Sequence, residues 1–214
     1  MNVYLRKKTA MNNKGFTLIE TIVAIAMLTV GILGGLALAV YALGASDVAL
    51  KQITATHLAR EGVEAIRSQR DRNWNECNNW QTCADIGPGQ YCCRGWSLNI
   101  PSSVAGTNSY VTFSGVGWNI NYSNNWDNYR LYLDPNTGRY VTAGLAQNLR
   151  FYRRLTIYSE TAAPFSNNNP RLRIVSTVWW IGRGCPNPPN PASPKCKVMI
   201  ESYLTNWKDY ESPL

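Results

Sequence analysis

Apolar and charged positions divide the chain sharply near residue 47. Residues 21–46 contain no charged side chain, and they directly follow a single carboxylate at Glu20. About 20 apolar residues are enough for a helix to cross the hydrocarbon layer of a bilayer. Because only a helix satisfies its own backbone hydrogen bonds in lipid, the run predicts a transmembrane helix over residues 16–46.

Beyond residue 46 the apolar positions recur at three- and four-residue steps, which indicates one face of a helix. These positions are Ala55, Leu58, Ala59, Gly62, Val63 and Ile66, and the charged residues between them are Lys51, Arg60, Glu64, Arg67 and Arg70. We therefore expect one continuous helix from about Phe16 to about Arg72, roughly 85 Å long, whose second half (47–73) packs against a globular head. A cleaved secretory signal fits less well, because its apolar region has about 7–15 residues and then ends.

The remaining chain, residues 74–214, shows the alternation typical of strands. Alternating segments lie at 96–100, 110–113, 129–133, 139–142, 151–158, 171–181 and 197–204. Asp134-Pro135-Asn136-Thr137-Gly138 predicts the turn of a hairpin. The sequence thus predicts an α+β fold, in which the long helix packs on one face of a mostly antiparallel sheet.

Two features of the head have a composition that could bind a ligand. Residues 115–128 combine aromatic and amide side chains, a composition that can stack sugars or bases, but we expect an irregular loop with Trp118 and Trp126 packed into the head. Five arginines (Arg150, Arg153, Arg154, Arg171 and Arg173) could form a DNA-facing patch. Their period-two spacing on predicted strands favours a solvated sheet face instead.

The distribution of charge predicts the orientation of the chain in the membrane and does not indicate a polyanionic partner. The formal net charge is +8, and four of the basic residues (Arg6, Lys7, Lys8, Lys14) precede Phe16. Without this leader, 17 basic residues face 13 acidic ones, which is a mild excess, and a nucleic-acid partner is not expected. Because basic residues remain on the cytoplasmic side of a spanning helix, the leader is expected in the cytoplasm and the head outside.

All six cysteines follow the apolar run. They are Cys77, Cys83, Cys92, Cys93, Cys185 and Cys196. An even number in loop-like sequence favours disulfides and an oxidising compartment, with free buried thiols as the alternative. We expect Cys185 to pair with Cys196 and the other four to pair among themselves. No metal or cofactor is predicted, because paired ligand spacing for zinc is missing.

The sequence contains no recognisable catalytic motif. The only histidine, His57, falls on the predicted helix, where a surface position is expected. We find no phosphate-binding glycine loop and no G-x-S-x-G segment, and a nucleophile generally needs a positioned base. The chain is therefore not expected to be an enzyme.

The segment Lys14-Gly15-Phe16-Thr17-Leu18-Ile19-Glu20 resembles the prepilin peptidase site of type IV pilins and type II secretion pseudopilins. The resemblance implies removal of the basic leader, residues 1–15, by cleavage between Gly15 and Phe16, and N-methylation of Phe16. It also implies that Glu20 meets the charged N-terminus of a neighbouring subunit, since a buried carboxylate needs a charge partner. The alternative is an interfacial glutamate favoured by the helix dipole.

The same resemblance implies a set of partners and a location. The partners are a prepilin peptidase/methyltransferase, other pilin subunits in a helical filament, an inner-membrane assembly platform and, before assembly, membrane lipid. The expected location is the inner membrane, single-pass with a cytoplasmic N-terminus, followed by an extracellular or periplasmic filament.

Glycines rather than proline mark the apolar helix. Gly31, Gly34 and Gly35 each cost a helix about 1 kcal/mol relative to Ala. They are either close-packing sites for neighbouring helices or, by the resemblance, a segment that loosens in the filament. The proline that many major pilins carry in this helix is missing, which favours a minor subunit.

The expected function is thus a prepilin-type subunit that assembles into, or primes, a type IV pilus or related pseudopilus. Two alternatives remain: a membrane-tethered adhesin or glycan-binding module, and a DNA-binding minor pilin of an uptake machine.

Overall fold

In the computed structural model, the described residues are 15, 17–77, 96–97, 99–115, 117–143, 149–165, 170–182, 184–186, 192–193 and 195–206, without the side chains of 76, 77, 149 and 150. The chain divides into two compact units, Met1–Asp47 and Val48–Leu214.

Helix α1 (Leu18–Cys77) is a single uninterrupted helix of 60 residues. We predicted its end near Arg72, and this was wrong by about one turn. The last turns are held by packing: Trp74 is 2% exposed, and its Nε1 donates to Asn206 Oδ1 at 3.1 Å. Asn73 Nδ2 donates to the Trp96 carbonyl at 3.0 Å. Tertiary contacts therefore carry the helix into the Asn-rich segment that its local sequence disfavours.

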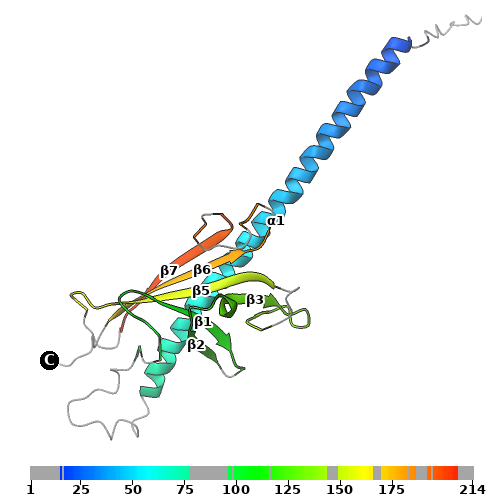
Figure 1. Ribbon diagram of the computed structural model, residues 1–214. Helices are drawn as coiled ribbons and strands as arrows, with labels where there is room; N and C mark the ends of the chain where they lie inside the picture. The colour runs from blue at the N-terminus through cyan, green and yellow to red at the C-terminus, as the bar shows by residue number, and fades with distance from the viewer. Residues whose placement is uncertain are drawn as a thin grey trace, which may run out of the picture. The chain divides into compact units, whose positions relative to one another are not determined.

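The head contains one antiparallel sheet, which Figure 1 shows against the second half of α1. Its strands are β1 (Thr107–Phe113), β2 (Trp118–Tyr122), β3 (Arg130–Leu133), β4 (Tyr140–Val141), β5 (Leu149–Glu160), β6 (Arg171–Trp180) and β7 (Lys197–Leu204). Strand β5 is central. One edge pairs with β6, which in turn pairs with β7, and the other edge pairs with β1 and β3. The fold is α+β and pilin-like, as predicted.

The core lies between α1 and the sheet, and it contains the whole predicted helix face. Ala55, Leu58 and Ala59 pack in one cluster with residues of β3, β5 and β6. Val63 and Ile66 belong to a second cluster with residues of β5 and β6. All six residues of the predicted face are buried, so the amphipathic prediction is confirmed.

Gly62 marks the closest approach of helix and sheet. A Cβ at this position would lie 2.9 Å from Leu155 Cδ2 and 3.0 Å from Ser176 Oγ. Because real Cβ contacts are rarely this short, the glycine lets α1 lie directly on β5 and β6.

Two predictions about the strands were wrong. Residues 96–100 do not form a strand in their described part: Asn99 has φ 60°, and the Ile100 amide donates to the Ser97 carbonyl across a turn. Asparagine tolerates this left-handed conformation better than most residues. Conversely, the expected loop 115–128 contains strand β2 and a short 3-10 helix, η2 (Trp126–Tyr129).

An aromatic cluster covers part of the sheet face opposite α1. Tyr152 stacks on Trp179 with ring centroids 5.5 Å apart, and Trp126 and Tyr129 of η2 meet Trp179 edge-on. Burial raises the pKa of the Tyr129 hydroxyl. Trp126 and Trp118 therefore do not share one binding surface, because Trp118 packs against the core on the helix side.

Candidate functional site

Helix α1 begins immediately after the predicted processing position. Gly15 is exposed, with no atom within 4 Å of a Cβ built there, and Phe16 lies outside the described residues. The Glu20 amide donates to the Thr17 carbonyl at 3.0 Å and lies 3.4 Å from Thr17 Oγ1. Thr17 is thus the N-cap, and Glu20 stands at the third helical position, which is the T-x-x-E spacing of a capping box.

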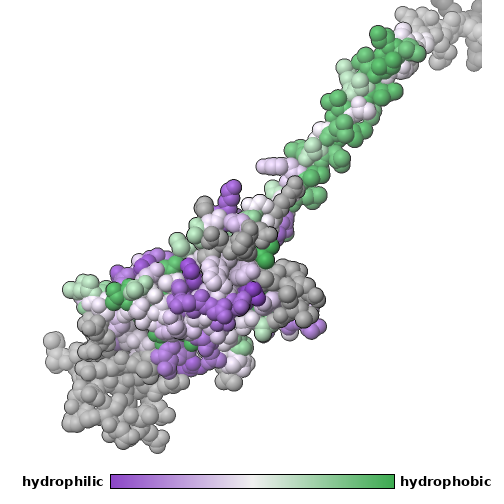
Figure 2. Space-filling model, viewed as in Figure 1, coloured by the Kyte–Doolittle hydropathy of each residue, from purple (hydrophilic) through white to green (hydrophobic). Residues whose placement is uncertain are grey.

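The first part of α1 offers a continuous apolar surface. Every side chain from Leu18 to Leu50 is exposed, and Figure 2 shows the apolar residues covering the visible face of this segment. Among the described residues, α1 is the helix long and apolar enough to span a membrane. The helix continues through Gly31, Gly34 and Gly35 without a break. The loosening expected from the resemblance concerns the filament, and it stays a prediction.

Comparison with family models supports the resemblance at this end of the chain. The model described as the prokaryotic N-terminal methylation motif matches residues 10–36. Searches of curated proteins and of solved structures found no match.

The motif and the architecture point to the same class of protein. An apolar N-terminal helix packed on an antiparallel sheet is the pilin-like fold, and the methylation motif is the hallmark of type IV pilin and pseudopilin precursors. The chain thus carries the N-terminal signature of prepilin-type proteins together with a pilin-like architecture. The motif supports processing by a prepilin peptidase and assembly with other pilin subunits, and it points to a structural subunit rather than an enzyme.

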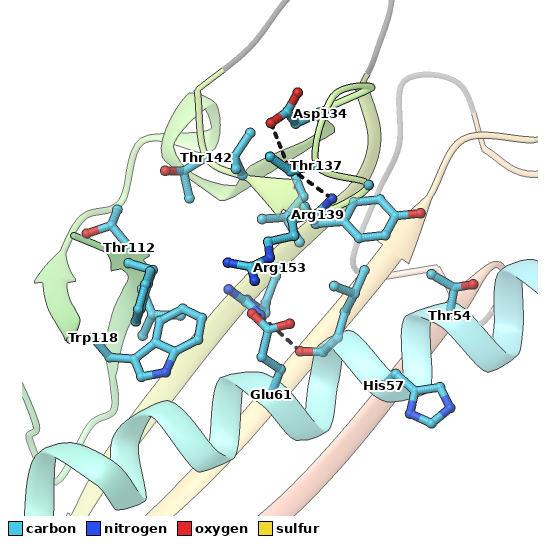
Figure 3. Close-up of a pocket in the computed structure, with 17 residues that line it drawn as sticks. Thr54, His57, Glu61, Thr112, Trp118, Asp134, Thr137, Arg139, Thr142 and Arg153 are labelled. Atoms are coloured by element: carbon cyan, nitrogen blue, oxygen red, sulfur yellow. Dashed lines mark hydrogen bonds and ion pairs between the residues drawn. The ribbon is translucent and has the colours of Figure 1, made fainter. Parts of the chain in front are cut away.

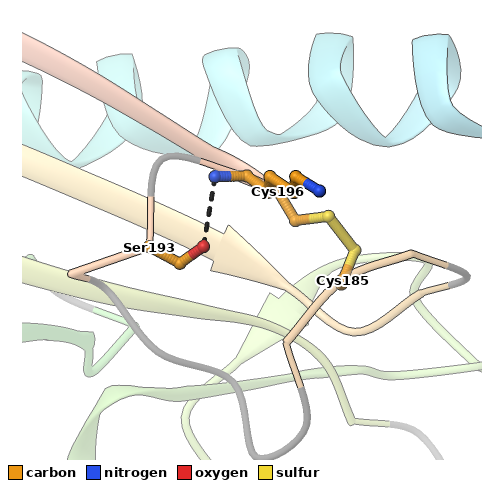
Figure 4. Close-up of a disulfide and its surroundings, with 4 residues drawn as sticks. Cys185, Ser193 and Cys196 are labelled. Atoms are coloured by element: carbon orange, nitrogen blue, oxygen red, sulfur yellow. Dashed lines mark hydrogen bonds between the residues drawn. A yellow bond between two sulfur atoms is a disulfide. The ribbon is translucent and has the colours of Figure 1, made fainter.

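One predicted disulfide is present in the head. Cys185 and Cys196 are joined, with Cα atoms 5.6 Å apart, as Figure 4 shows. Both half-cystines pack against the α1 cluster formed by Ala55, Leu58 and Ala59. The Trp180 amide donates to the Cys196 carbonyl at 3.2 Å. The bridge therefore closes the connection between β6 and β7 against the helix.

The other cysteines cannot be placed. Cys83, Cys92 and Cys93 lie outside the described residues, and the Cys77 side chain is not described. Their pairing among themselves stays a prediction.

The predicted arginine cluster does not exist as one surface. Arg153 is 4% exposed and lies beneath α1, where its Nη1 donates to the Leu58 carbonyl at 3.1 Å and to Glu61 Oε1 at 3.0 Å. Burial lowers the pKa of Arg153, and Glu61 opposes this effect. Its alternation with Phe151, Leu155 and Ile157 was the signal that should have placed it inward.

The arginines on the opposite face have acidic partners. Arg171 pairs with Glu160 at 2.5 Å, and Arg173 pairs with Glu160 at 3.2 Å and with Glu201 at 3.5 Å. The Arg173 guanidinium also lies 3.9 Å from the centre of the Tyr158 ring. Arg171 and Arg173 therefore belong to an ion-pair network, and on this face Arg154 is half-buried with a buried Nε that lacks a partner.

His57 is exposed on α1, as expected for a helix-surface residue. Among the described residues, no group of three or more His, Cys, Asp or Glu side chains is placed to hold a metal ion.

Proposed function

We propose that this chain is a filament subunit that is stored in the inner membrane with its N-terminus in the cytoplasm. It is cleaved between Gly15 and Phe16, methylated at Phe16, and assembled into a type IV pilus or related pseudopilus, which it extends or primes. One observation carries the proposal: the methylation motif at 10–36 opens a helix that runs unbroken to Cys77.

The two halves of α1 support the two stages of this proposal. Residues 18–46 expose apolar side chains that are stable only in lipid or against other apolar helices. From Ala55 to Trp74, in contrast, the helix contributes to the core of the head. Moving the subunit from membrane to filament would thus exchange lipid for neighbouring helices without unfolding the head. The missing proline supports a minor rather than a major subunit.

Glu20 has two competing roles, and they can be separated. In the first role its negative charge pairs with the amine of a neighbouring Phe16. In the second it completes a capping box with Thr17, worth about 0.5–2 kcal/mol of helix stability. Glutamine serves at this capping position as well as glutamate does, but it carries no charge.

The test compares Glu20→Gln with Thr17→Ala in cells that carry the assembly machinery. We expect Glu20→Gln to be processed and to accumulate in the membrane but to be lost from sheared filaments, because the charge is gone. We expect Thr17→Ala to enter filaments. The reverse pattern, with Glu20→Gln incorporated and Thr17→Ala lost, would show that capping is the function of this segment.

Of the predicted arginine cluster, Arg153 is buried and Arg171 and Arg173 have acidic partners. Arg154 is half-buried, with a buried Nε that lacks a partner, and this one side chain does not form a basic patch for a DNA-binding minor pilin. We therefore do not propose a nucleic-acid partner.

A further inference from the structure

A cavity opens where the sheet divides. On one edge of β5, strand β1 pairs with Leu155, Thr156 and Ile157, and β3 pairs with Leu149, Phe151 and Tyr152. Arg153 and Arg154 lie between these two registers. The β1–β2 and β3–β4 hairpins therefore diverge from β5, and together with α1 they enclose a cavity of about 690 Å³. Cavities of about 300–1,000 Å³ typically hold small ligands.

Arg153 lies at the centre of this cavity, as Figure 3 shows. Its Nη1 makes both hydrogen bonds described above, to Leu58 and Glu61. The hydrogen bonds found for this side chain among the described residues are made by Nη1, and Nε and Nη2 are not among the fully buried atoms that lack a partner. These two donors therefore face the open space of the cavity. These two atoms form the edge of a guanidinium that binds a carboxylate through two parallel hydrogen bonds. A donor edge that faces a cavity beside a buried guanidinium is available to an acceptor from outside the chain.

The acidic residues that line the cavity are already engaged. Glu61 accepts from Arg153 Nη1 at 3.0 Å. Asp134 accepts from Thr137 Oγ1 at 2.6 Å and from the Asn136 amide at 3.0 Å, within its own turn. Arg139 lines the same cavity and forms no ion pair with a described acidic residue. Among the described residues, the Arg139 guanidinium thus remains available to an acidic ligand.

The rest of the lining is largely apolar. Phe113 and Trp118 contribute rings whose centroids are 5.3 Å apart in an edge-on arrangement, and Leu58, Val111 and Leu131 close the inner side. Aromatic faces of this kind pack well against a planar or ring-shaped ligand.

We propose that this cavity binds a small ligand that carries one carboxylate on a ring-sized body, with the carboxylate on the Nε/Nη2 edge of Arg153 and the ring against Trp118. Two sources share this chemistry: an acidic sugar and an aromatic acid. The ligand-binding proposal is independent of filament assembly. A negative result in the binding test would therefore leave the proposed function unchanged.

The test measures binding to the full chain, solubilised in a non-ionic detergent, by isothermal titration calorimetry. Two matched pairs of probes are used: methyl β-D-glucuronide with methyl β-D-glucoside, and phenylacetate with phenylacetamide. We expect the acid of one pair to bind at least about ten-fold more tightly than its neutral partner, since bidentate pairing to Arg needs the carboxylate. The pair that shows the difference identifies the source.

Matched variants locate the binding site. Arg139→Gln should weaken binding of the acidic probe several-fold. Arg60→Gln makes the same charge change at an exposed position of α1 and should leave that binding unchanged. Trp118→Leu should weaken binding about ten-fold, and Trp126→Leu, on the other face of the sheet, should not.

Three outcomes would overturn the proposal. The first is equal binding of acid and neutral probes, and the second is no binding of either acid. The third is loss of binding in Trp126→Leu but not in Trp118→Leu, which would move the site to the opposite face. If Trp118→Leu fails to fold, the two arginine variants still test the site, because equal binding of the acidic probe by Arg139→Gln and Arg60→Gln would contradict the proposal.

Discussion

Replacing Glu61 by glutamine removes the carboxylate that faces the buried Arg153 guanidinium. Arg153 is 4% exposed in its side chain, and Glu61 is 39% exposed. The variant keeps a hydrogen-bond acceptor of the same size, so the change isolates the charge. Glu64, about one turn further along α1, forms a matched control, because it pairs with Arg67 and the two side chains are 59% and 40% exposed.

The two pairs differ in the expected cost of removing the acid. Breaking a fully buried pair costs about 3–5 kcal/mol, because the remaining charge is left without compensation. Solvent reaches Glu61, and the Leu58 carbonyl remains as a partner of Arg153. We therefore reduce the expected loss for Glu61→Gln to about 1–2 kcal/mol. For Glu64→Gln we expect about 0–0.5 kcal/mol, as for other exposed helix pairs.

Urea denaturation of the full chain in detergent, followed by tryptophan fluorescence, measures both values. Trp74, Trp96 and Trp179 are buried in the head and report its unfolding. Equal losses of unfolding free energy in the two variants would refute the reasoning, because they would show that Arg153 is solvated rather than dependent on Glu61.

Three further predictions concern the head. Double replacement of Cys185 and Cys196 by serine should lower the free energy of unfolding by about 2–3 kcal/mol, and reductant should then lower it less than in the unmodified chain. The hydroxyl of Thr137 and the Asn136 amide lower the pKa of Asp134. This carboxylate therefore contributes stability above its unfolded pKa that is lost as the pH falls through its folded pKa, and Thr137→Val should raise that pKa in an NMR titration. Gly106→Ala should lower the free energy of unfolding, measured by urea denaturation, by about 2 kcal/mol or more. The reason is that φ is 89° at this position and the new Cβ would lie 2.5 Å from a tyrosine ring of β5. An unchanged urea midpoint would contradict this prediction.

The helix and its buried face could be predicted because their cause is local. The step from an uncharged run to a three- and four-residue period is visible in the sequence, and both halves follow from it. Alternation likewise predicted the positions of β1, β3 with β4, β5, β6 and β7, and the turn at Asp134 fixed the hairpin of β3 and β4.

Strand β2 shows where composition misled. Trp118, Ile120 and Tyr122 alternate with asparagines, which are common in loops and disfavoured in strands. The period-two signal was therefore present. Pairing with β1, where Val111 lies opposite Ile120, overrides the low strand propensity of asparagine.

The cavity depends on relations that no local pattern contains. Its existence follows from the divided pairing of β5, and its donor edge follows from the meeting of Arg153 with Leu58 and Glu61, more than ninety residues earlier. Alternation could place Arg153 on the inner face of β5. It could not show which carbonyl or carboxylate would face it.

The intact mass of the protein extracted from membranes tests the central claim most directly. In a host with an active prepilin peptidase and methyltransferase, we expect a chain that begins at Phe16 and is heavier by one CH2 unit than the unmodified sequence from Phe16 onward, because a methyl group replaces one hydrogen. A bulky replacement, Gly15→Leu, should leave the leader attached and serves as the control. A native chain that retains its leader in that host would contradict the account.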